Sequence, residues 1–157
     1  MILEVQAMVE KGATKEKIGL RGSMPPGVLF AVYDAETGAP DYIPPEYSDI
    51  PELLDELVEY VNKTDDHPLI IAAVVHYQLV TIHPFEDGNG RTARLMSGYI
   101  LDFYGYGFNG IGSLEEYLLM IRTSITLHFR WACRYYIIPE EKIRHILKSG
   151  LIISFEW

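Results

Sequence analysis

Residues 69–104 read LIIAAVVHYQLVTI-HPFEDGNGRTAR-LMSGYILDFY, and this stretch decides the fold. Its two outer parts, 69–82 and 95–104, are strongly apolar, and the second repeats its large side chains at helical spacing. The middle part, 83–94, is polar and interrupted by glycine, so a core position does not explain it. The pattern predicts two helices joined by a loop that carries chemistry.

The loop has the composition of a phosphate site. Gly88 and Gly90 lack a Cβ, so the backbone there can take positive φ and turn its N–H groups inward, just before a helix N-terminus that favours an anion. Arg91 and Arg94 lie on the first turn of that helix, where cations oppose the helix dipole. A polyphosphate explains both, since guanidinium groups pair well with phosphate oxygens. Asp87 is a hard oxygen ligand suited to Mg²⁺.

His83 precedes the loop and can accept a proton near neutral pH. Other kinds of site fit these residues less well. A calcium-binding EF-hand fails because its ligand positions would fall on Arg91 and Gly98. A metal site made of His76 and His83 is a weaker interpretation than a packed His76, because the surroundings are apolar. The phosphate-loop pattern G-x-x-x-x-G-K-[ST] is absent.

At residues 83–94 the chain resembles the Fic (filamentation induced by cAMP) family, whose signature is H-x-F-x-[DE]-G-N-G-R-x-x-R. Every specified position of that signature is present, at His83, Phe85, Asp87, Gly88, Asn89, Gly90, Arg91 and Arg94. The resemblance implies a mainly α fold, a Fic-type helical bundle with a small β-hairpin flap before the motif.

The resemblance also implies a role for each residue. His83 would be the catalytic base that deprotonates a Ser, Thr or Tyr hydroxyl of a target protein. That oxygen would attack the α-phosphate of ATP, leaving AMP on the target and releasing pyrophosphate. Asp87 would hold Mg²⁺ against the α- and β-phosphates. The Gly88–Gly90 backbone and the Asn89 side chain would form an anion hole. Arg91 and Arg94 would bind the β- and γ-phosphates. Phe85 would anchor the loop in the core.

These roles predict a protein adenylyltransferase with ATP as substrate and Mg²⁺ as cofactor. Two alternatives stay open. The site could transfer UMP, phosphate or phosphocholine, because its expected contacts are to phosphates, or the chain is a catalytically inactive binding or toxin-like module. Many Fic proteins carry an inhibitory [ST]-x-x-x-E-[GN] helix, which this sequence lacks. Inhibition then falls to a partner protein, to sequence outside this chain, or to neither.

Two segments before the motif complete the predicted bundle. Ser48–Pro51 is a helix start, and the helix after it has one apolar stripe, which we expect to be buried, made of Leu53, Leu54, Leu57, Val58 and Val61. Residues 28–43 instead favour a hairpin, with a β-prone run at Val28–Tyr33 and a partner strand from Tyr42. It is either a surface ribbon that closes the core or, as the resemblance suggests, a flap that binds the target segment by strand addition. The flap residues would be Phe30, Ala31, Val32 and Tyr33.

Composition limits the remaining classes. With 157 residues, 48% of them hydrophobic, the chain can bury the core of one domain. A single cysteine fits a reducing compartment, and the acidic start Met-Ile-Leu-Glu is no secretory signal, so we expect a cytoplasmic protein. A net charge of −9 argues against nucleic acid and anionic membranes as partners.

The chain changes character near residue 117. Residues 1–117 contain 7 basic and 19 acidic side chains, whereas residues 118–157 contain 6 and 3, together with both tryptophans and the single cysteine. The resemblance to Fic proteins also ends there. We therefore predict a Fic domain over 1–117 and an atypical tail over 118–157. A shift of reading frame at Leu118 explains the tail, and an ordinary divergent pair of basic helices is the competing interpretation. Gly105 and Gly107 should end the helix after the motif, and Ser113–Glu116 should open another.

Overall fold

The computed structural model describes residues 1–33 and 37–107. The helices there are α1 (Ile2–Val9), α2 (Ile50–Lys63), α3 (Pro68–Ile82) and α4 (Asn89–Phe103), and one antiparallel sheet joins β1 (Val32–Tyr33) to β2 (Pro40–Tyr42). The predicted helix start at 113–116, the boundary at 117 and the tail at 118–157 lie outside the described residues. The prediction of a mainly helical domain with a small hairpin is confirmed.

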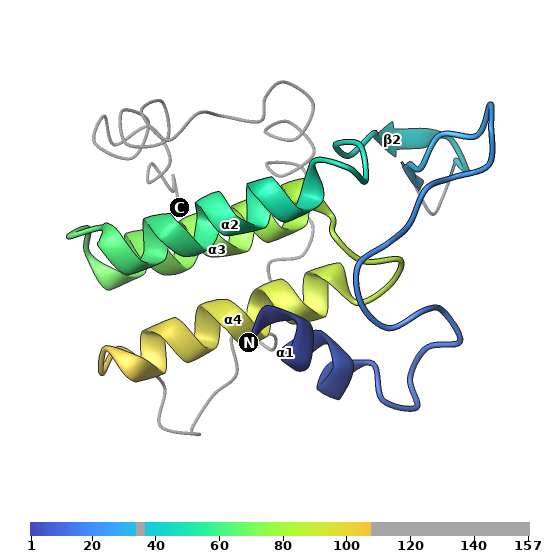
Figure 1. The fold of residues 1–157 in the computed structure, drawn as a ribbon. Helices are drawn as coiled ribbons and strands as arrows, with labels where there is room; N and C mark the ends of the chain where they lie inside the picture. The colour runs from blue at the N-terminus through green and yellow to red at the C-terminus, as the bar shows by residue number, and fades with distance from the viewer. Residues whose placement is uncertain (34–36, 108–157) are drawn as a thin grey trace.

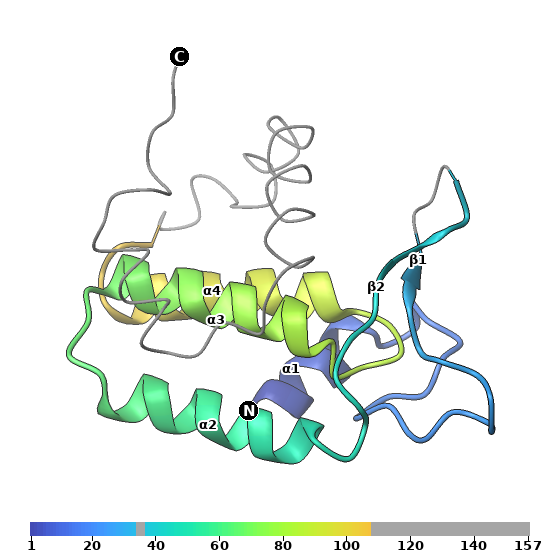
Figure 2. The ribbon, with the colours of Figure 1, turned by 90° about the horizontal axis from the view of Figure 1, so that it is seen from above.

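The core lies between the two helices that flank the motif. Helices α3 and α4 pack along each other, α2 contacts α3, and α1 contacts α4 (Figures 1 and 2). The buried cluster consists of Leu57, Ile71, Ala72, Val75, Leu79, Ala93, Met96, Ile100 and Leu101. Each large apolar side chain in such a cluster contributes about 1.5–3 kcal/mol relative to an exposed position. The loop between α3 and α4 is therefore fixed at both of its ends.

Helix α2 begins where the sequence predicts, at Ile50, with Asp49 as N-cap and proline in the first turn. Its apolar stripe is narrower than predicted. Leu57 is buried, but Val58 is 44% exposed and the rest of the stripe is half-buried. The physical reason is that the contacts of α2 with the other described helices are mainly with α3, so one line of its side chains is covered.

Helix α4 also buries less of its apolar face than its periodicity suggests. Met96 and Ile100 are buried, whereas Leu95, Tyr99 and Phe103 are 53%, 52% and 71% exposed. Small residues complete the contact with α3. The Ser97 hydroxyl donates to the Ala72 carbonyl at 3.0 Å, which holds the two backbones close together. The helix ends at Phe103, and Gly105 follows with φ of +78°, as predicted.

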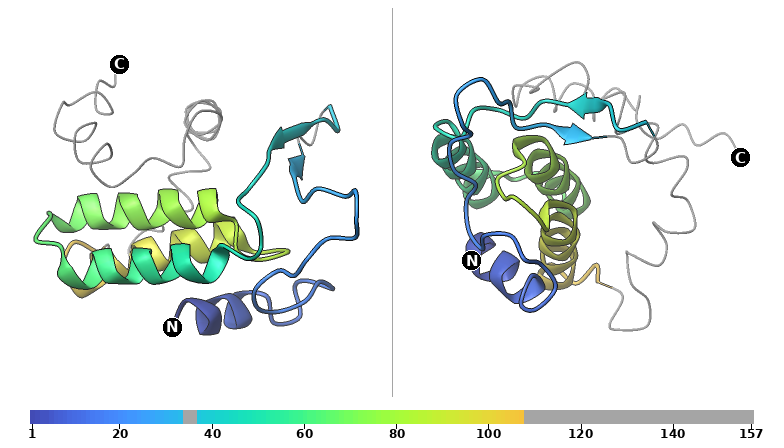
Figure 3. Two further views of the ribbon diagram at one scale, coloured as in Figure 1. Left: turned by 45° about the horizontal axis from the view of Figure 1, so that its top comes forward. Right: turned by 90° about the vertical axis from the view of Figure 1, so that its right-hand side faces the viewer.

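The hairpin is shorter than predicted. Only Val32 and Tyr33 of the expected run form β1, and Val28 and Leu29 precede it as exposed chain. The partner strand β2 ends at Tyr42, where the sequence predicts that it begins. Figures 1 and 3 show the hairpin standing beyond the helix ends, beside the α3–α4 loop. An isolated two-stranded ribbon is marginal in water, and this explains why so few residues pair. The Tyr42 hydroxyl ties the ribbon to the end of α3 through the Thr81 carbonyl, at 2.8 Å.

Within residues 1–33 and 37–107, the helices are all too short or too polar to cross a bilayer.

Candidate functional site

His83 ends α3 in the left-handed conformation, with φ of 50° and ψ of 57°. It is the one non-glycine residue with positive φ in the described part of the chain, and histidine tolerates this region better than most residues. The imidazole Nδ1 lies 3.1 Å from the Val80 carbonyl oxygen. Because a carbonyl only accepts, Nδ1 must carry the proton in neutral imidazole, and Nε2 keeps a lone pair. His83 is thus in the tautomer that a base acting through Nε2 requires.

The surroundings of His83 favour its neutral form. Burial is the largest cause and lowers the pKa of His83, the hydrogen bond to Val80 raises it, and the positive charge of Arg21 lowers it further. The net result is a pKa below the ordinary value of 6.5. His83 is therefore uncharged, and able to accept a proton, at pH 7.

The first part of the loop is closed by a side chain from the motif itself. Phe85 is fully buried, in the position that its predicted anchoring role requires. The Asn89 side chain accepts from the Phe85 N–H and donates to the Phe85 carbonyl, each at 2.9 Å. Both polar groups of Asn89 are thus bound to the loop backbone. The Asn89 amide therefore holds the loop backbone in shape, and its place in an anion hole stays a prediction.

The start of α4 offers N–H groups to a ligand. Gly88 is the N-cap, with φ of 84°, and no side chain caps the helix there. The first bond of the helical ladder runs from the Thr92 N–H to the Gly88 carbonyl, at 2.8 Å, so the N–H groups of residues 89–91 precede it. The prediction of positive φ is confirmed at Gly88.

At Gly90 that prediction is wrong, because this residue lies inside α4 with ordinary helical φ. Its lack of a side chain serves another purpose. A Cβ at Gly90 would lie 3.2 Å from the Arg94 guanidinium, so glycine leaves room for that side chain.

Asp87 is a partly exposed, ionised carboxylate. Its Oδ1 accepts from the Gly88 N–H at 2.6 Å and lies 3.0 Å from Arg91 Nη2. Burial raises the pKa of Asp87, but hydrogen bonds from Gly88, Thr14 and Arg91 outweigh it and leave the pKa below its ordinary value. The described residues gather no group of three His, Cys, Asp or Glu. Mg²⁺ bound with nucleotide phosphates needs only one or two protein carboxylates, so Asp87 fits such an ion.

The two arginines of α4 contact different helices. Arg91 Nη2 lies 3.0 Å from a carboxylate oxygen of Glu10, at the end of α1. Arg94 lies toward α3, where burial, followed by the Arg94 charge, lowers the pKa of His76 to about 4. His76 is therefore a neutral, packed histidine between these helices at pH 7. Both side chains are partly exposed near the start of α4. A ligand bound at this helix start could therefore reach both guanidinium groups, as their predicted phosphate-binding roles require.

Sequence reasoning missed two buried charges beside the loop. Glu10 is fully buried, and its carboxylate lies over Gly88, where an added Cβ would be 2.2 Å from Glu10 Oε1. Arg21 is 5% exposed, and its Nε donates to the His83 carbonyl at 2.8 Å. A charged residue within a short loop or a short helix gives no periodic signal, so only the fold reveals these contacts.

The predicted flap residues lie near His83 but not all at the site. The Phe30 ring centroid is 6.1 Å from that of His83. Ala31 and Val32 are half-buried, and Tyr33 is 60% exposed. The structure therefore brings Phe30 to the base and leaves Tyr33 at the surface.

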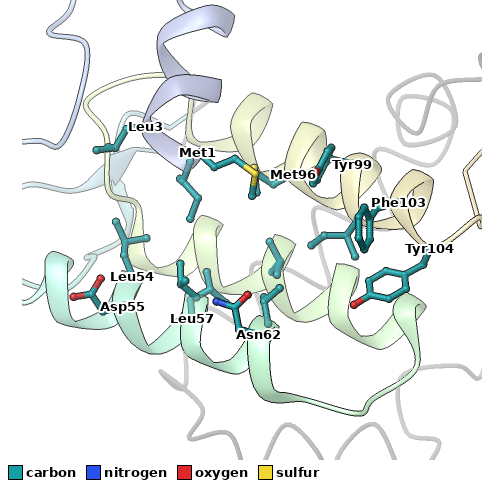
Figure 4. A pocket seen from close by; sticks show the side chains of 15 residues that line it. Met1, Leu3, Leu54, Asp55, Leu57, Asn62, Met96, Tyr99, Phe103 and Tyr104 are labelled. Atoms are coloured by element: carbon teal, nitrogen blue, oxygen red, sulfur yellow. The ribbon is translucent and has the colours of Figure 1, made fainter.

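An apolar groove elsewhere in the molecule is separate from this loop. Figure 4 shows it between the helices, with Met1, Leu57, Met96 and Phe103 among its walls. No residue of the 83–94 motif lines this groove, and Met96, which lies two residues beyond the motif, is the lining residue nearest to it in the sequence. Its lining has no arginine or histidine, so it lacks the groups that bind a polyphosphate.

Comparison with known proteins agrees with this geometry. The model of the Fic/DOC family matches residues 2–101. The chain is 42% identical over 69 residues to "Protein adenylyltransferase Fic" of Nematostella vectensis, and 43% identical over 68 residues to the protein of that name from Drosophila mojavensis. These matches cover 42% and 41% of this chain but 16% and 14% of the relatives. The chain thus matches about one sixth of the length of these curated relatives.

Solved structures show the same arrangement of helices. A Fic domain containing signaling protein from Bacteroides thetaiotaomicron is 32% identical, with a TM-score of 0.54, over 66% of this chain and 38% of that one. Fic-1 from C. elegans is 34% identical, with a TM-score of 0.51, over 66% of this chain and 28% of that one. The predicted fold class is confirmed.

Proposed function

The chain belongs to the Fic/DOC family, and on this premise we propose that it is a protein adenylyltransferase that moves AMP from ATP to a protein hydroxyl. The observation that carries the proposal is the pairing of a base with an anion site. The protonated Nδ1 of His83 is held by Val80, and the uncapped start of α4 with its two arginines begins six residues later, at Asn89. Most of the catalysis in phosphoryl transfer comes from such positioning and charge stabilisation.

The proposed reaction starts at His83. Nε2 takes the proton of a Ser, Thr or Tyr hydroxyl on the target, and the oxygen attacks the α-phosphorus of ATP. The bond from the α-phosphorus to the bridging oxygen breaks, so AMP stays on the target and pyrophosphate leaves with the electron pair of that bond. The N–H groups at the start of α4 stabilise the charge that develops on the phosphate oxygens. The Asn89 amide acts here by holding the loop in shape, through Phe85.

The charged residues of the loop are arranged to receive a cation and a polyphosphate together. In the structure Asp87 pairs with Arg91, and their side chains are 43% and 38% exposed. An ion pair as exposed as this contributes little to stability. We propose that Mg²⁺, held by Asp87, and the phosphates, held by Arg91 and Arg94, replace that pair. Bound Mg²⁺ neutralises charge on the α- and β-phosphates.

The target, the donor and the extent of the domain belong to the same proposal. A peptide would pair with the hairpin beside Phe30 and present its hydroxyl to His83. Transfer of UMP, phosphate or phosphocholine is the second candidate, because the described side chains that suit a nucleotide would contact its phosphates rather than its base. We take residues 1–117 as the Fic domain and 118–157 as a frame-shifted tail, in a cytoplasmic protein. Inhibition by a separate partner, by sequence outside this chain, or by neither stays open. Codons in the coding DNA that do not fit the second frame would remove the tail hypothesis.

The test is transfer of label from α-labelled ATP with Mg²⁺ to proteins of a cell lysate, with α-labelled UTP in parallel. We expect labelled protein bands with ATP and their loss in His83→Ala. A His67→Ala variant is the matched control, since His67 caps the start of α3 and the loop begins at the other end of that helix. Transfer that His83→Ala leaves unchanged, or no transfer from any nucleotide, would contradict the proposal and favour an inactive binding module.

A further inference from the structure

Arg21 is a buried cation outside the 83–94 motif, and its hydrogen-bond partners come from two separate segments. Its Nε donates to the His83 carbonyl at 2.8 Å, and its backbone N–H donates to the Pro84 carbonyl at 2.9 Å. A terminal nitrogen of the same guanidinium donates to the Pro45 carbonyl, in the chain between β2 and α2. The side chain is thus fixed at several points, and only 5% of the residue is exposed.

The hydrogen bond to the His83 carbonyl acts on the strained residue itself. A non-glycine residue in the left-handed region persists only where its surroundings hold it there. The carbonyl oxygen of His83 belongs to the peptide plane that sets its ψ of 57°. A charged donor at 2.8 Å is a strong hydrogen bond and resists rotation of that plane. Arg21 therefore helps to hold the backbone from which the imidazole projects.

The same guanidinium also contacts the arm that leads to the hairpin. Its central carbon lies 4.6 Å from the centroid of the Phe30 ring, within cation–π distance. That ring lies 6.1 Å from the imidazole of His83. Arg21, Phe30 and His83 thus form one closed set of contacts, in which Arg21 touches the other two. Arg21 therefore contacts both the residue that carries the base, His83, and the segment that leads into the hairpin, at Phe30.

We propose that Arg21 is a positioning residue that holds the imidazole of His83 and the Phe30 end of the hairpin in one fixed relation. The inference rests on the proposed function, in which His83 is the base and the hairpin receives the target. The alternative is a purely structural arginine, whose loss destabilises the domain without a particular effect at His83.

The experiment compares Arg21→Lys and Arg21→Gln in the full chain with Lys17→Gln, an exposed cation four residues away that serves as control. Lysine keeps the charge but offers no planar fork, and glutamine removes the charge. In AMP transfer we expect kcat to fall on the order of 10²-fold for Arg21→Gln, since misplacement of a catalytic group by about 1 Å has an effect of this size. KM for ATP should stay within about threefold of wild type, because Arg91 and Arg94 supply the phosphate contacts.

A second measurement does not depend on activity. Carbon–proton NMR of the imidazole rings follows His83, with its signal assigned by its absence in His83→Gln. In wild type we expect a ring-to-ring cross-peak between Phe30 and His83. In Arg21→Gln that cross-peak should weaken, and the pKa of His83 should rise, because a positive charge that lowers it is gone. Phe30→Leu, which leaves Arg21 in place, should shift the same His83 signals.

The outcomes separate the inference from the proposed function. If wild-type protein transfers no label but the NMR changes occur, the proposed function fails and the positioning role stands. If Arg21→Gln does not fold, Arg21→Lys and Phe30→Leu decide by the same two readouts. Folded Arg21 variants with wild-type kcat and unchanged His83 signals would overturn the inference. So would a fall in kcat that merely follows the folded fraction.

Discussion

Two buried charges contact the 83–89 loop near its two ends, and they do so in different ways. Arg21, on the His83 side, donates to carbonyl oxygens and covers an aromatic ring. Glu10, on the Gly88 side, has an ion pair with Arg91, and its oxygens make no hydrogen bond of good geometry to the described residues. A buried charge with several hydrogen bonds is well compensated, and one with a single ion pair is not. The comparison indicates that the loop is rigid where Arg21 binds it, at His83, and is held less firmly where Glu10 meets it, at Gly88.

The largest effect should come from removing the well-compensated charge. Arg21→Leu leaves the carbonyls of His83 and Pro45 without their donor, and it releases the strained backbone of His83. A buried carbonyl that loses its donor costs about 1–3 kcal/mol, and two carbonyls lose theirs here, so the expected total is about 2–6 kcal/mol. We expect a decrease of this size in the free energy of unfolding in urea. Lys17→Leu, at an exposed site, is the control, and a change below about 1 kcal/mol in Arg21→Leu would contradict the rigidity of the loop at His83.

Acid should have the next largest effect, through His76 and His83, whose pKa values are lowered mainly by burial. The pKa values of His83 and His76 are lower in the folded chain than the ordinary 6.5, with His76 at about 4. Below pH 6.5 the unfolded chain therefore binds more protons, and stability falls as the pH decreases toward the folded pKa. For His76 the full loss, reached below pH 4, is about 3 kcal/mol.

Urea unfolding between pH 7 and pH 4 measures this loss. His76→Gln should remove most of the slope, and His83→Gln a smaller part of it. Asn62→Gln, at an exposed position without a titratable group, is the control and should keep the wild-type slope. An equal slope in all four proteins would show that the two buried histidines are not its cause.

The next prediction concerns Gly88, the point where Glu10 meets the loop. Gly88→Ala places a Cβ 2.2 Å from Glu10 Oε1 and also imposes a side chain at φ of +84°. The backbone strain alone is about 1–2 kcal/mol, and the contact adds to it. Thermal unfolding of Gly88→Ala, Glu10→Ala and the double variant separates the two parts, since shortening Glu10 removes only the contact. If the double variant is as destabilised as the two single changes added together, the Glu10 carboxylate does not lie on Gly88.

The sequence predicts the chemical groups of the loop better than it predicts the residues that hold the loop in place. The motif residues and the helices around them could be identified because spacing along the chain determines both. Helix α2 begins, and α3 and α4 begin and end, close to the predicted positions. The roles of Arg21 and Glu10 could not be identified from the sequence, because their partners are distant along the chain: Arg21 and His83 are 62 residues apart.

Helix α1 inverts the usual pattern. Its fully buried side chains are the polar Gln6 and, at its C-cap, Glu10, while Leu3 and Met8 are 47% and 69% exposed. Apolar periodicity therefore gives no signal for this helix. Asn89 illustrates a different limit, because an amide can bind a ligand or the backbone, and only the fold decides between them.

The smallest effect on stability should come from Glu10. Glu10→Leu removes a fully buried carboxylate, and Arg91 keeps Asp87 as partner and is 38% exposed, so no buried charge is left behind. Replacement of a buried ion pair by an apolar side chain is often neutral or stabilising. We expect the free energy of unfolding to change by less than about 1 kcal/mol or to rise, in contrast to Arg21→Leu. Binding of ATP with Mg²⁺, measured by calorimetry, should become tighter, because Arg91 no longer faces a second carboxylate that repels the phosphates. A loss of several kcal/mol would show instead that both ends of the loop are equally rigid, and the difference between Arg21 and Glu10 would then have no consequence for the site.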